Sequence, residues 1–240
     1  MPCRSKPPYL QPSSIARCLR RPRFAGIALC WLAISPAPAQ EIGKLYATRP
    51  PPGSAFIRIA SIGDIKLGPK LHINTRDLPI AGSDIASRYR AVRADAQVKL
   101  SIDGAAVGEN VTFLPDRFYT VVIAREGANW KSHAIDEGQG GNASDLKAQL
   151  RFFNLMPGCE ATLRIAEGPT VFDAVAFTTV KSRTINPVEA QLEAICGGSH
   201  VSLKLPQLRA GDHYSLFLTQ TGGKSALSGQ FDETEPYRDR

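Results

Sequence analysis

The chain has 240 residues and a formal net charge of +7, with 43% hydrophobic and 21% charged residues. This composition is typical of a folded globular protein and excludes a disordered chain. Six of the 29 Lys and Arg residues lie within the first 39 residues, which hold no Asp or Glu. The other 23 nearly balance the 22 acidic residues, so bulk charge does not favour nucleic acid or another free polyanion as a partner.

The N-terminal segment has the pattern of a secretory signal peptide. A basic cluster at 17–23 precedes an apolar run at 24–34, and small residues follow at Ala37 and Ala39. We expect a signal peptide over 1–39, cleaved after about Ala39, which indicates export. The run is too short for a bilayer core, which needs about 20 residues; the alternative is an uncleaved anchor. No later segment is apolar enough to span a membrane.

The mature chain alternates apolar and polar residues in short runs that are typical of strands. In chain order these are 55–59, 98–102, 118–123, 201–205 and 214–218. Turn signals separate them at Gly63-Asp64, Asp103-Gly104, Pro157-Gly158, Gly197-Gly198, Gly211-Asp212 and Gly222-Gly223. No segment keeps a helical period for long. The pattern predicts an all-β protein of the sandwich type.

The sequence also repeats itself at an offset of 93 to 95 residues. The motif 118–123 parallels 213–218, 131–132 parallels 224–225, and 56–58 parallels 149–151. We therefore expect two tandem small β-sandwich domains, immunoglobulin-like or jelly-roll-like, after the cleaved signal peptide. The predicted boundaries are 45–137 for the first domain, 138–145 for a Gly-rich linker and 146–235 for the second domain.

Two cysteines, Cys159 and Cys196, lie outside the predicted signal peptide. An even pair in an exported chain favours a disulfide. It would close a loop of about 38 residues and stabilise the fold by roughly 4 kcal/mol. Two buried free thiols are the alternative. A metal site is disfavoured, because no His stands at ligand spacing from either cysteine.

Motifs for catalysis are missing from the sequence. There is no G-x-S-x-G, and none of the four histidines has an Asp three residues before it. Asp212-His213 is interpreted as a turn that leads into a strand, with a surface histidine. Asp136-Glu137 and Asp232-Glu233 could be paired carboxylates, but their matching places after the last strand of each repeat favour solvated domain ends. We therefore predict no catalytic residue, no metal and no cofactor.

Two local groups are candidates for contact with a polymer or a protein partner. Trp130 stands beside Lys131 at a predicted strand edge, where the ring could stack on a sugar. The second group is a basic run around one aromatic ring, formed by Arg88, Tyr89, Arg90 and Arg93. The alternative for the basic run is a solvated strand or loop face. Tyr119 and Tyr214, which recur at one strand position, are more typical of core.

Several blocks in order resemble the AlgF family of alginate biosynthesis proteins. They are 45–46, 51–58, 116–120, 150–155 and 185–188. The resemblance implies two β-sandwich domains in the periplasm, beside a membrane-bound O-acyltransferase and a separate periplasmic acetyltransferase that carry out the chemistry. It implies no catalytic motif in this chain. The cysteine pair departs from the family, and the polysaccharide could be alginate or cellulose.

The leading hypothesis is a non-catalytic periplasmic component of an exopolysaccharide O-acetylation complex. It would position the acetyltransferase and the polymer, with the polysaccharide itself as a further candidate partner. The alternative is a secreted double β-sandwich that binds carbohydrate or acts like an adhesin, without an enzyme partner. A third hypothesis is an acetyltransferase whose motif is not recognisable.

Overall fold

Sixteen β-strands make up the regular secondary structure of the computed structural model, which describes residues 52–62, 71–80, 84–139 and 146–236. These residues include no helix that is long and apolar enough to cross a membrane. The predicted all-β class is confirmed. The predicted signal peptide and most of the predicted linker lie outside the described residues, and the domain boundaries stay a prediction.

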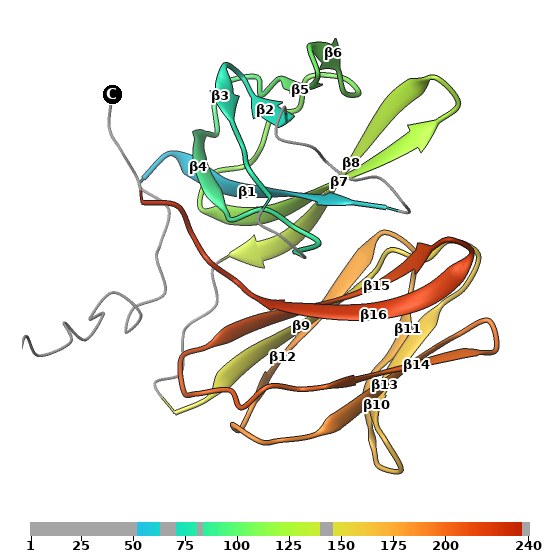
Figure 1. The fold of residues 1–240 in the computed structure, drawn as a ribbon. Coiled ribbons are helices and arrows are strands. Elements are labelled where there is room, and N and C mark those ends of the chain that lie inside the picture. Colours follow the sequence, from blue (N-terminus) through green and yellow to red (C-terminus); the bar gives the residue numbers. More distant parts are fainter. Residues whose placement is uncertain (1–51, 63–70, 81–83, 140–145, 237–240) are drawn as a thin grey trace, which may run out of the picture. The chain divides into compact units, whose positions relative to one another are not determined.

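The first half of the chain supplies eight strands: β1 (Ser54–Ser61), β2 (Leu71–Ile73), β3 (Arg76–Asp77), β4 (Arg90–Arg93), β5 (Leu100–Ile102), β6 (Ala105–Ala106), β7 (Arg117–Glu126) and β8 (Asn129–Gln139). They form a sheet of order β4-β1-β7-β8 and a smaller sheet of order β3-β2-β5-β6. The long β7–β8 hairpin is visible in green in Figure 1.

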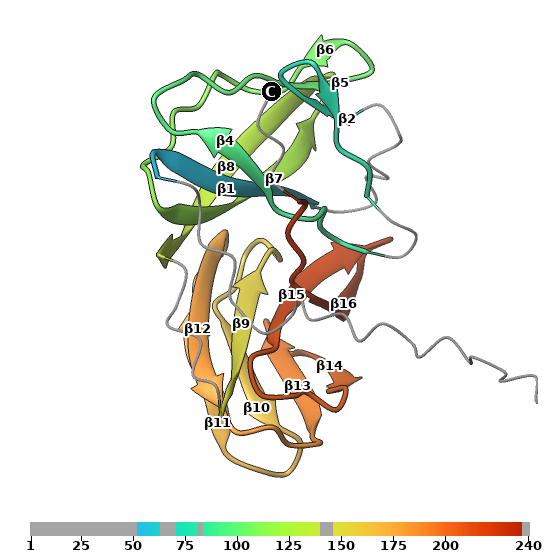
Figure 2. The same cartoon turned by 90° about the vertical axis from the view of Figure 1, so that its left-hand side faces the viewer.

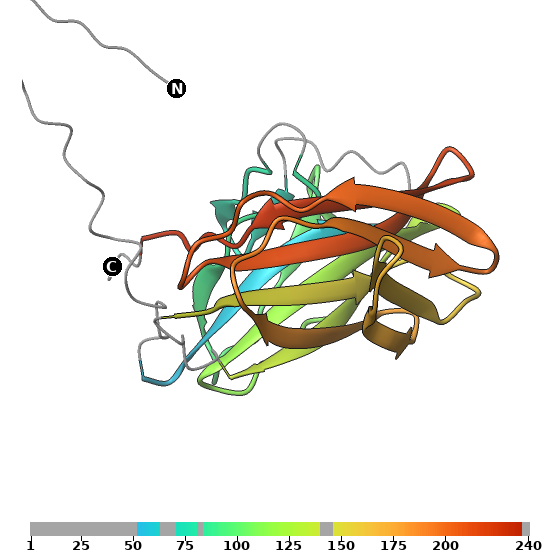
Figure 3. The ribbon, with the colours of Figure 1, turned by 90° about the horizontal axis from the view of Figure 1, so that it is seen from below.

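The second half supplies the other eight: β9 (Ala148–Asn154), β10 (Ala161–Ile165), β11 (Thr170–Val175), β12 (Thr179–Ile185), β13 (Gln191–Cys196), β14 (Ser199–Lys204), β15 (His213–Thr221) and β16 (Lys224–Phe231). They form sheets of order β12-β9-β15-β16 and β11-β10-β13-β14. Figure 2 shows β9 between β12 and β15, and Figure 3 shows the β15–β16 hairpin in red.

Each half buries an apolar core between its two sheets. In the first half, alternate residues of β1 and β7 pack against β2 and β5, for example Ile57 and Val121 with Leu71 and Leu100. In the second half, β9 and β15 pack against β10 and β13, for example Leu150 with Leu163. Two sheets with a shared apolar core are a sandwich, so the predicted pair of β-sandwiches is confirmed.

The same topology organises the main sheet of both halves. β1 pairs in parallel with β7, with Ile57 opposite Tyr119, and β9 pairs in parallel with β15, with Leu150 opposite Tyr214. Each of these central pairs has an antiparallel strand on either side. This register makes residues of the two halves equivalent at the offset of 93 to 95 residues that the sequence repeat predicts.

The central strands are buried on both faces, which a sheet with one solvated face would not show. The face away from each sandwich core contributes to a third apolar cluster, which joins residues of both halves: Ala60, Ala86, Val122, Ile135, Phe153, Leu155 and Phe217. The described residues from 52 onward belong to one compact unit. The main sheets of the two halves therefore bury side chains against each other.

A disulfide joins Cys159 and Cys196 in the second half, as predicted, with their Cα atoms 5.6 Å apart. Cys159 precedes β10 and Cys196 ends β13, the neighbouring strand of the same sheet. The bond therefore fixes one end of the β10–β13 pair, close to the core residues that Cys196 contacts.

Candidate functional site

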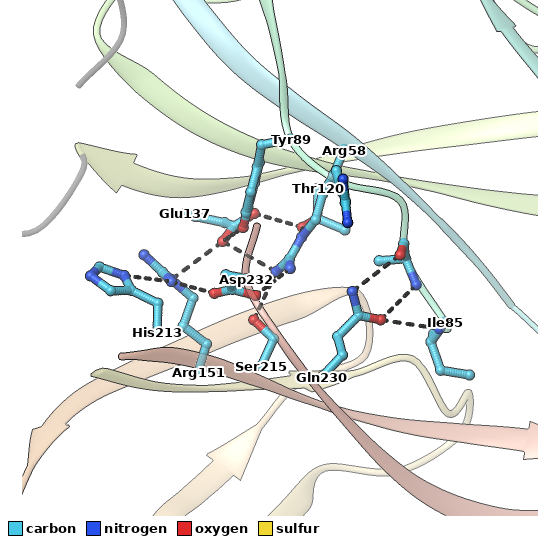
Figure 4. A network of polar contacts seen from close by, with 12 residues as sticks. Arg58, Ile85, Tyr89, Thr120, Glu137, Arg151, His213, Ser215, Gln230 and Asp232 are labelled. Atoms are coloured by element: carbon cyan, nitrogen blue, oxygen red, sulfur yellow. Dashed lines mark hydrogen bonds and ion pairs between the residues drawn. The ribbon is translucent and has the colours of Figure 1, made fainter. Parts of the chain in front are cut away.

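Four charged side chains meet between the main sheets of the two halves, and we call them the ion network: Arg58, Glu137, Arg151 and Asp232 (Figure 4). Arg58 lies on β1 and Arg151 at the equivalent position on β9. Glu137 lies at the end of β8, where a register shift in the β7–β8 pairing skips one residue. Asp232 directly follows β16.

Arg58 uses each of its side-chain nitrogens and is fully buried. Its Nε donates to Thr120 Oγ1 at 2.8 Å, beside it on the same sheet. Its Nη1 donates to Asp232 Oδ1 at 2.6 Å, and its Nη2 donates to Ser215 Oγ at 2.9 Å. One arginine of the first half is therefore bonded to two groups of the second half.

Arg151 extends the ion network on the other side. Its Nη1 donates to Asp232 Oδ2 at 2.7 Å, so Asp232 bridges the two arginines with its two oxygens. Its Nε lies 3.3 Å from Glu137 Oε2, although no hydrogen bond to this nitrogen forms among the described residues. Nη1 also lies 3.4 Å from Nδ1 of His213, a contact whose donor depends on the histidine tautomer.

Glu137 accepts hydrogen bonds from neutral groups as well as facing the arginines. Thr120 Oγ1 donates to its Oε1 at 2.6 Å, and the Tyr89 hydroxyl donates to its Oε2 at 2.7 Å. Arg58 Nη2 lies 3.5 Å from the same Oε2. The Glu137 side chain is only 1% exposed, so these contacts replace its hydration.

The ion network is balanced, with two cations and two anions. Burial alone would raise the pKa of Asp232, but Arg58 and Arg151 outweigh it and hold that pKa below its ordinary value. Burial alone would lower the pKa of Arg58, yet Tyr89, Asp232 and Glu137 favour the charged form and raise it. Removal of one member would leave an uncompensated buried charge, which costs far more than the intact network contributes.

Aromatic rings enclose Arg58. Its guanidinium carbon lies 4.4 Å from the centre of the Tyr89 ring and 5.1 and 5.2 Å from those of Phe153 and Phe217. Cation–π contacts of this kind gain strength when the cation is desolvated. Burial raises the pKa of the Tyr89 phenol well above its ordinary value, so Tyr89 acts as a neutral donor.

Residues 230–235, which follow most of β16, make hydrogen bonds to the first half of the chain, and we call them the C-terminal strap. The Gln230 side-chain amide accepts from the backbone N–H groups of Ile85 and Ala86 and donates to the carbonyl of Ala86. The backbone of Tyr89 donates to the Glu233 carbonyl and accepts from the Glu235 N–H, each at 2.8 Å. The strap thus covers the strand edge beside the ion network.

The four residues of the predicted basic group around Tyr89 differ in their exposure and in their partners. Tyr89 is 2% exposed, and its ring packs on Arg58 and on Phe118. Arg88 pairs with Glu233 of the C-terminal strap, and half-buried Arg90 pairs with Glu235. Arg93 is exposed and pairs with Asp95.

Trp130 is half-buried against the first core, with Arg125 over its ring at 5.3 Å, and Lys131 beside it is exposed. Contact of this pair, or of Arg88 and Arg93, with a polymer or partner stays a prediction. The expectation that Tyr119 and Tyr214 are core residues agrees with their burial.

The prediction of solvated domain ends is wrong for Glu137 and Asp232, which are buried in the ion network. The sequence signal was present: an arginine and a carboxylate recur at the repeat offset, Arg58 with Arg151 and Glu137 with Asp232. An arginine in the middle of an apolar strand needs a buried carboxylate, so the two recurrences together could have predicted the pairing.

The site brings serine, histidine and aspartate together, but not as a nucleophilic triad. Ser215 is fully buried and accepts a hydrogen bond from Arg58. His213 faces Arg151, which stands between it and Asp232. Burial, followed by the charge of Arg151, lowers the pKa of His213. Within the described ranges, no group of three or more His, Cys, Asp or Glu side chains could hold a metal ion.

Comparison with known proteins gives one consistent family. The family model described as "Alginate O-acetyl transferase AlgF" matches residues 28–213. The alginate biosynthesis protein AlgF of Pseudomonas aeruginosa is 30% identical over 192 residues, which cover 77% of this chain and 81% of that protein. A solved structure of the C-terminal domain of AlgF from P. aeruginosa is 36% identical over 36% of this chain and 98% of that one, with a TM-score of 0.32.

Proposed function

Because the chain belongs to the AlgF family, we propose that it is a non-catalytic periplasmic component of an exopolysaccharide O-acetylation complex. Its partners are a periplasmic acetyltransferase and a membrane-bound O-acyltransferase of the same pathway, and its role is to position the acetyltransferase and the polymer. The curated relative is named an alginate biosynthesis protein, and alginate is accordingly the first polymer to test.

The proposal that this chain is not itself the enzyme is supported by the chemistry of the ion network. An acyl transfer by serine needs a nucleophile that substrate can reach and a base that takes its proton. Ser215 is inaccessible and its oxygen is held by Arg58, while His213 contacts a permanently charged guanidinium instead of a hydroxyl. The contacts of Arg58 with Asp232 and Ser215, and of Arg151 with Glu137, instead hold the two halves together.

A protein without an active site can raise the rate of acetylation by holding an enzyme near its substrate, since proximity alone supplies a large effective concentration. Such a role needs two binding surfaces at a fixed separation. The two sandwiches joined by the buried ion network and the third apolar cluster are suited to this, because few internal degrees of freedom remain between them.

The test is a pull-down of the periplasmic acetyltransferase by the mature chain, residues 40–240, beside a titration with alginate and with acetylated cellulose oligomers. We expect capture of the acetyltransferase and weak or no polymer binding, as the mature chain is nearly neutral. Polymer binding at low micromolar concentration without capture of the acetyltransferase would favour the carbohydrate-binding alternative.

A second experiment addresses catalysis directly. We expect His213→Ala and Ser215→Ala to leave polymer acetylation unchanged in cells whenever the variant protein is folded. Circular dichroism of the purified variants supplies the folding control. A large loss of acetylation in a folded His213→Ala protein would instead support an acetyltransferase activity in this chain.

A further inference from the structure

The four ion pairs of the ion network survive an exchange of the two halves, although their distances differ. The strand registers make Arg58 equivalent to Arg151 and place Thr120 and Ser215 at matching positions beside them. Exchange turns the Arg58–Asp232 contact of 2.6 Å into the Arg151–Glu137 contact of 3.3 Å.

Exchange also turns the Arg58–Glu137 contact of 3.5 Å into the Arg151–Asp232 contact of 2.7 Å. All four ion pairs are therefore present. A contact set in which each partner plays both roles is the mark of an isologous, two-fold interface of the kind that homodimers use.

The apolar row next to the charges does not share this symmetry. Two residues beyond the arginine, the first half carries Ala60 opposite Val122, and the second half carries Phe153 opposite Phe217. These four residues belong to the same buried cluster, and the two phenylalanine rings stack at 4.9 Å. The large pair of one half therefore fills the space that the small pair of the other half leaves.

We propose that the two halves bind each other through a face of homodimer type, in which the ion network sets the register and these four side chains select an unlike partner. Two faces with Phe pairs would crowd four rings into one layer, and two faces with Ala and Val would leave a cavity. Overpacking and cavities are each destabilising. Each half therefore pairs with the other half of the chain and not with a second copy of itself.

The test exchanges the large and small pairs in the full mature chain. One variant carries Phe153→Ala and Phe217→Val, a second carries Ala60→Phe and Val122→Phe, and a third carries all four substitutions. We expect both two-site variants to lower the midpoint of urea unfolding, and the four-site variant to recover more than half of the summed loss. The reason is that the four-site variant again has one pair of large side chains facing one pair of small ones. A four-site loss equal to the sum of the two would overturn the proposal.

A milder exchange covers the case in which a two-site variant does not fold. Val122→Leu and Phe217→Leu change each position by a small volume, and the two residues lie in one apolar cluster. We expect the double variant to lose less of the unfolding midpoint than the sum of the two single losses. Additive losses would show that the two positions do not share space, which contradicts the selection by size.

A matched control exchanges the hydroxyls of the polar row. Thr120 and Ser215 hold equivalent places, and Arg58 donates to both. Because either hydroxyl can accept from Arg58, we expect Thr120→Ser with Ser215→Thr to leave the unfolding midpoint near that of the unsubstituted chain. A loss as large as that of the variant with Phe153→Ala and Phe217→Val would show that exchange beside the charges costs as much as exchange in the apolar cluster, which overturns selection by the apolar residues.

Discussion

The main sheets of the two halves have the same strand order, whereas the sheets that cover them differ. The orders β4-β1-β7-β8 and β12-β9-β15-β16 match strand for strand. The outer sheet of the first half has strands of two or three residues, whereas that of the second half has strands of five or six. The shared part is the part that pairs with the other half, which indicates that mutual pairing places the stronger constraint on these sheets.

The carboxylates of the two halves also differ in how they serve the ion network. Asp232 bonds both arginines at 2.6 and 2.7 Å, whereas Glu137 stands 3.5 and 3.3 Å from them and accepts hydrogen bonds from Thr120 and Tyr89. The two equivalent carboxylates therefore differ in role: Asp232 makes the close ion pairs, and Glu137 is held mainly by hydrogen bonds from the neutral Thr120 and Tyr89.

The largest expected effect on the free energy of unfolding comes from a substitution of Asp232. Asp232→Asn leaves two buried guanidinium groups with one carboxylate, and we expect a loss of about 3–5 kcal/mol in the free energy of unfolding. Glu137→Gln is the matched comparison and should cost less, since the amide oxygen still accepts from Tyr89 or Thr120. Urea unfolding followed by circular dichroism measures both variants. An equal loss would contradict the difference in role between Asp232 and Glu137.

The disulfide, which the first half lacks among its described residues, gives the next largest effect. Cys159→Ser with Cys196→Ser should lower the free energy of unfolding by about 2–4 kcal/mol, because the unfolded chain regains the freedom of the closed loop. A chain unfolded in reductant without substitution should show the same loss. If the double variant unfolds at the midpoint of the oxidised chain, the bond contributes nothing to the longer outer sheet.

A pH effect that depends on a histidine is expected at His213, whose equivalent position in the first half is taken by Phe118. The pKa of His213 is lowered in the fold, so below its ordinary value of about 6.5 the unfolded chain takes up a proton that the folded chain does not. The stability from neutral His213 is therefore present above that pH and is lost as pH falls toward the folded pKa.

His213→Phe, which copies the first half, should remove this part of the pH dependence. Free energies of unfolding between pH 7.5 and 5 provide the measurement. The control is His200→Gln, at an exposed histidine that pairs with Glu193. This variant should keep the loss of stability that protonation of His213 causes in the unsubstituted chain. An unchanged profile in His213→Phe would mean that another group carries the acid sensitivity.

The smallest effect is expected at the surface of the C-terminal strap. The exposed Arg88–Glu233 pair should contribute only about 0–1 kcal/mol, so Arg88→Gln should be close to silent in thermal unfolding. Arg90→Gln should cost more, because half-buried Arg90 bonds both Glu235 oxygens and the Asp77 carbonyl. The reverse order would show that the exposed pair, and not the bidentate one, fastens the strap.

The sequence predicts the sandwiches well because they depend on local pattern. Runs such as 118–123 alternate cleanly, and the repeat offset places β7 and β15 at equivalent positions. It predicts the disulfide because only two cysteines follow the predicted signal peptide. The ion network depends instead on a face-to-face pairing of distant sheets. Periodicity assigns Arg58 to the face opposite the first core but does not say what covers that face.

Tyr89 illustrates the same limit. Its neighbours Arg88 and Arg90 indicate an exposed basic segment, and that is correct for Arg88. The ring is nevertheless buried, because it packs on Arg58 and Phe118 and its hydroxyl donates to Glu137, all distant from it in sequence. Contacts between residues so distant leave no local pattern that a single sequence reveals.

The C-terminal strap bears on the order in which the chain can acquire its structure. The backbone bonds of Tyr89 to Glu233 and Glu235, like the Arg90–Glu235 contact across 145 residues, can form only once residues 233–235 have been made. Synthesis runs from the N-terminus, so these bonds form only after the strands of both sandwiches have been made. Until then the backbone of Tyr89 lacks these partners and Arg58 lacks Asp232. A truncation at residue 229 should therefore damage the half of the protein that is translated first.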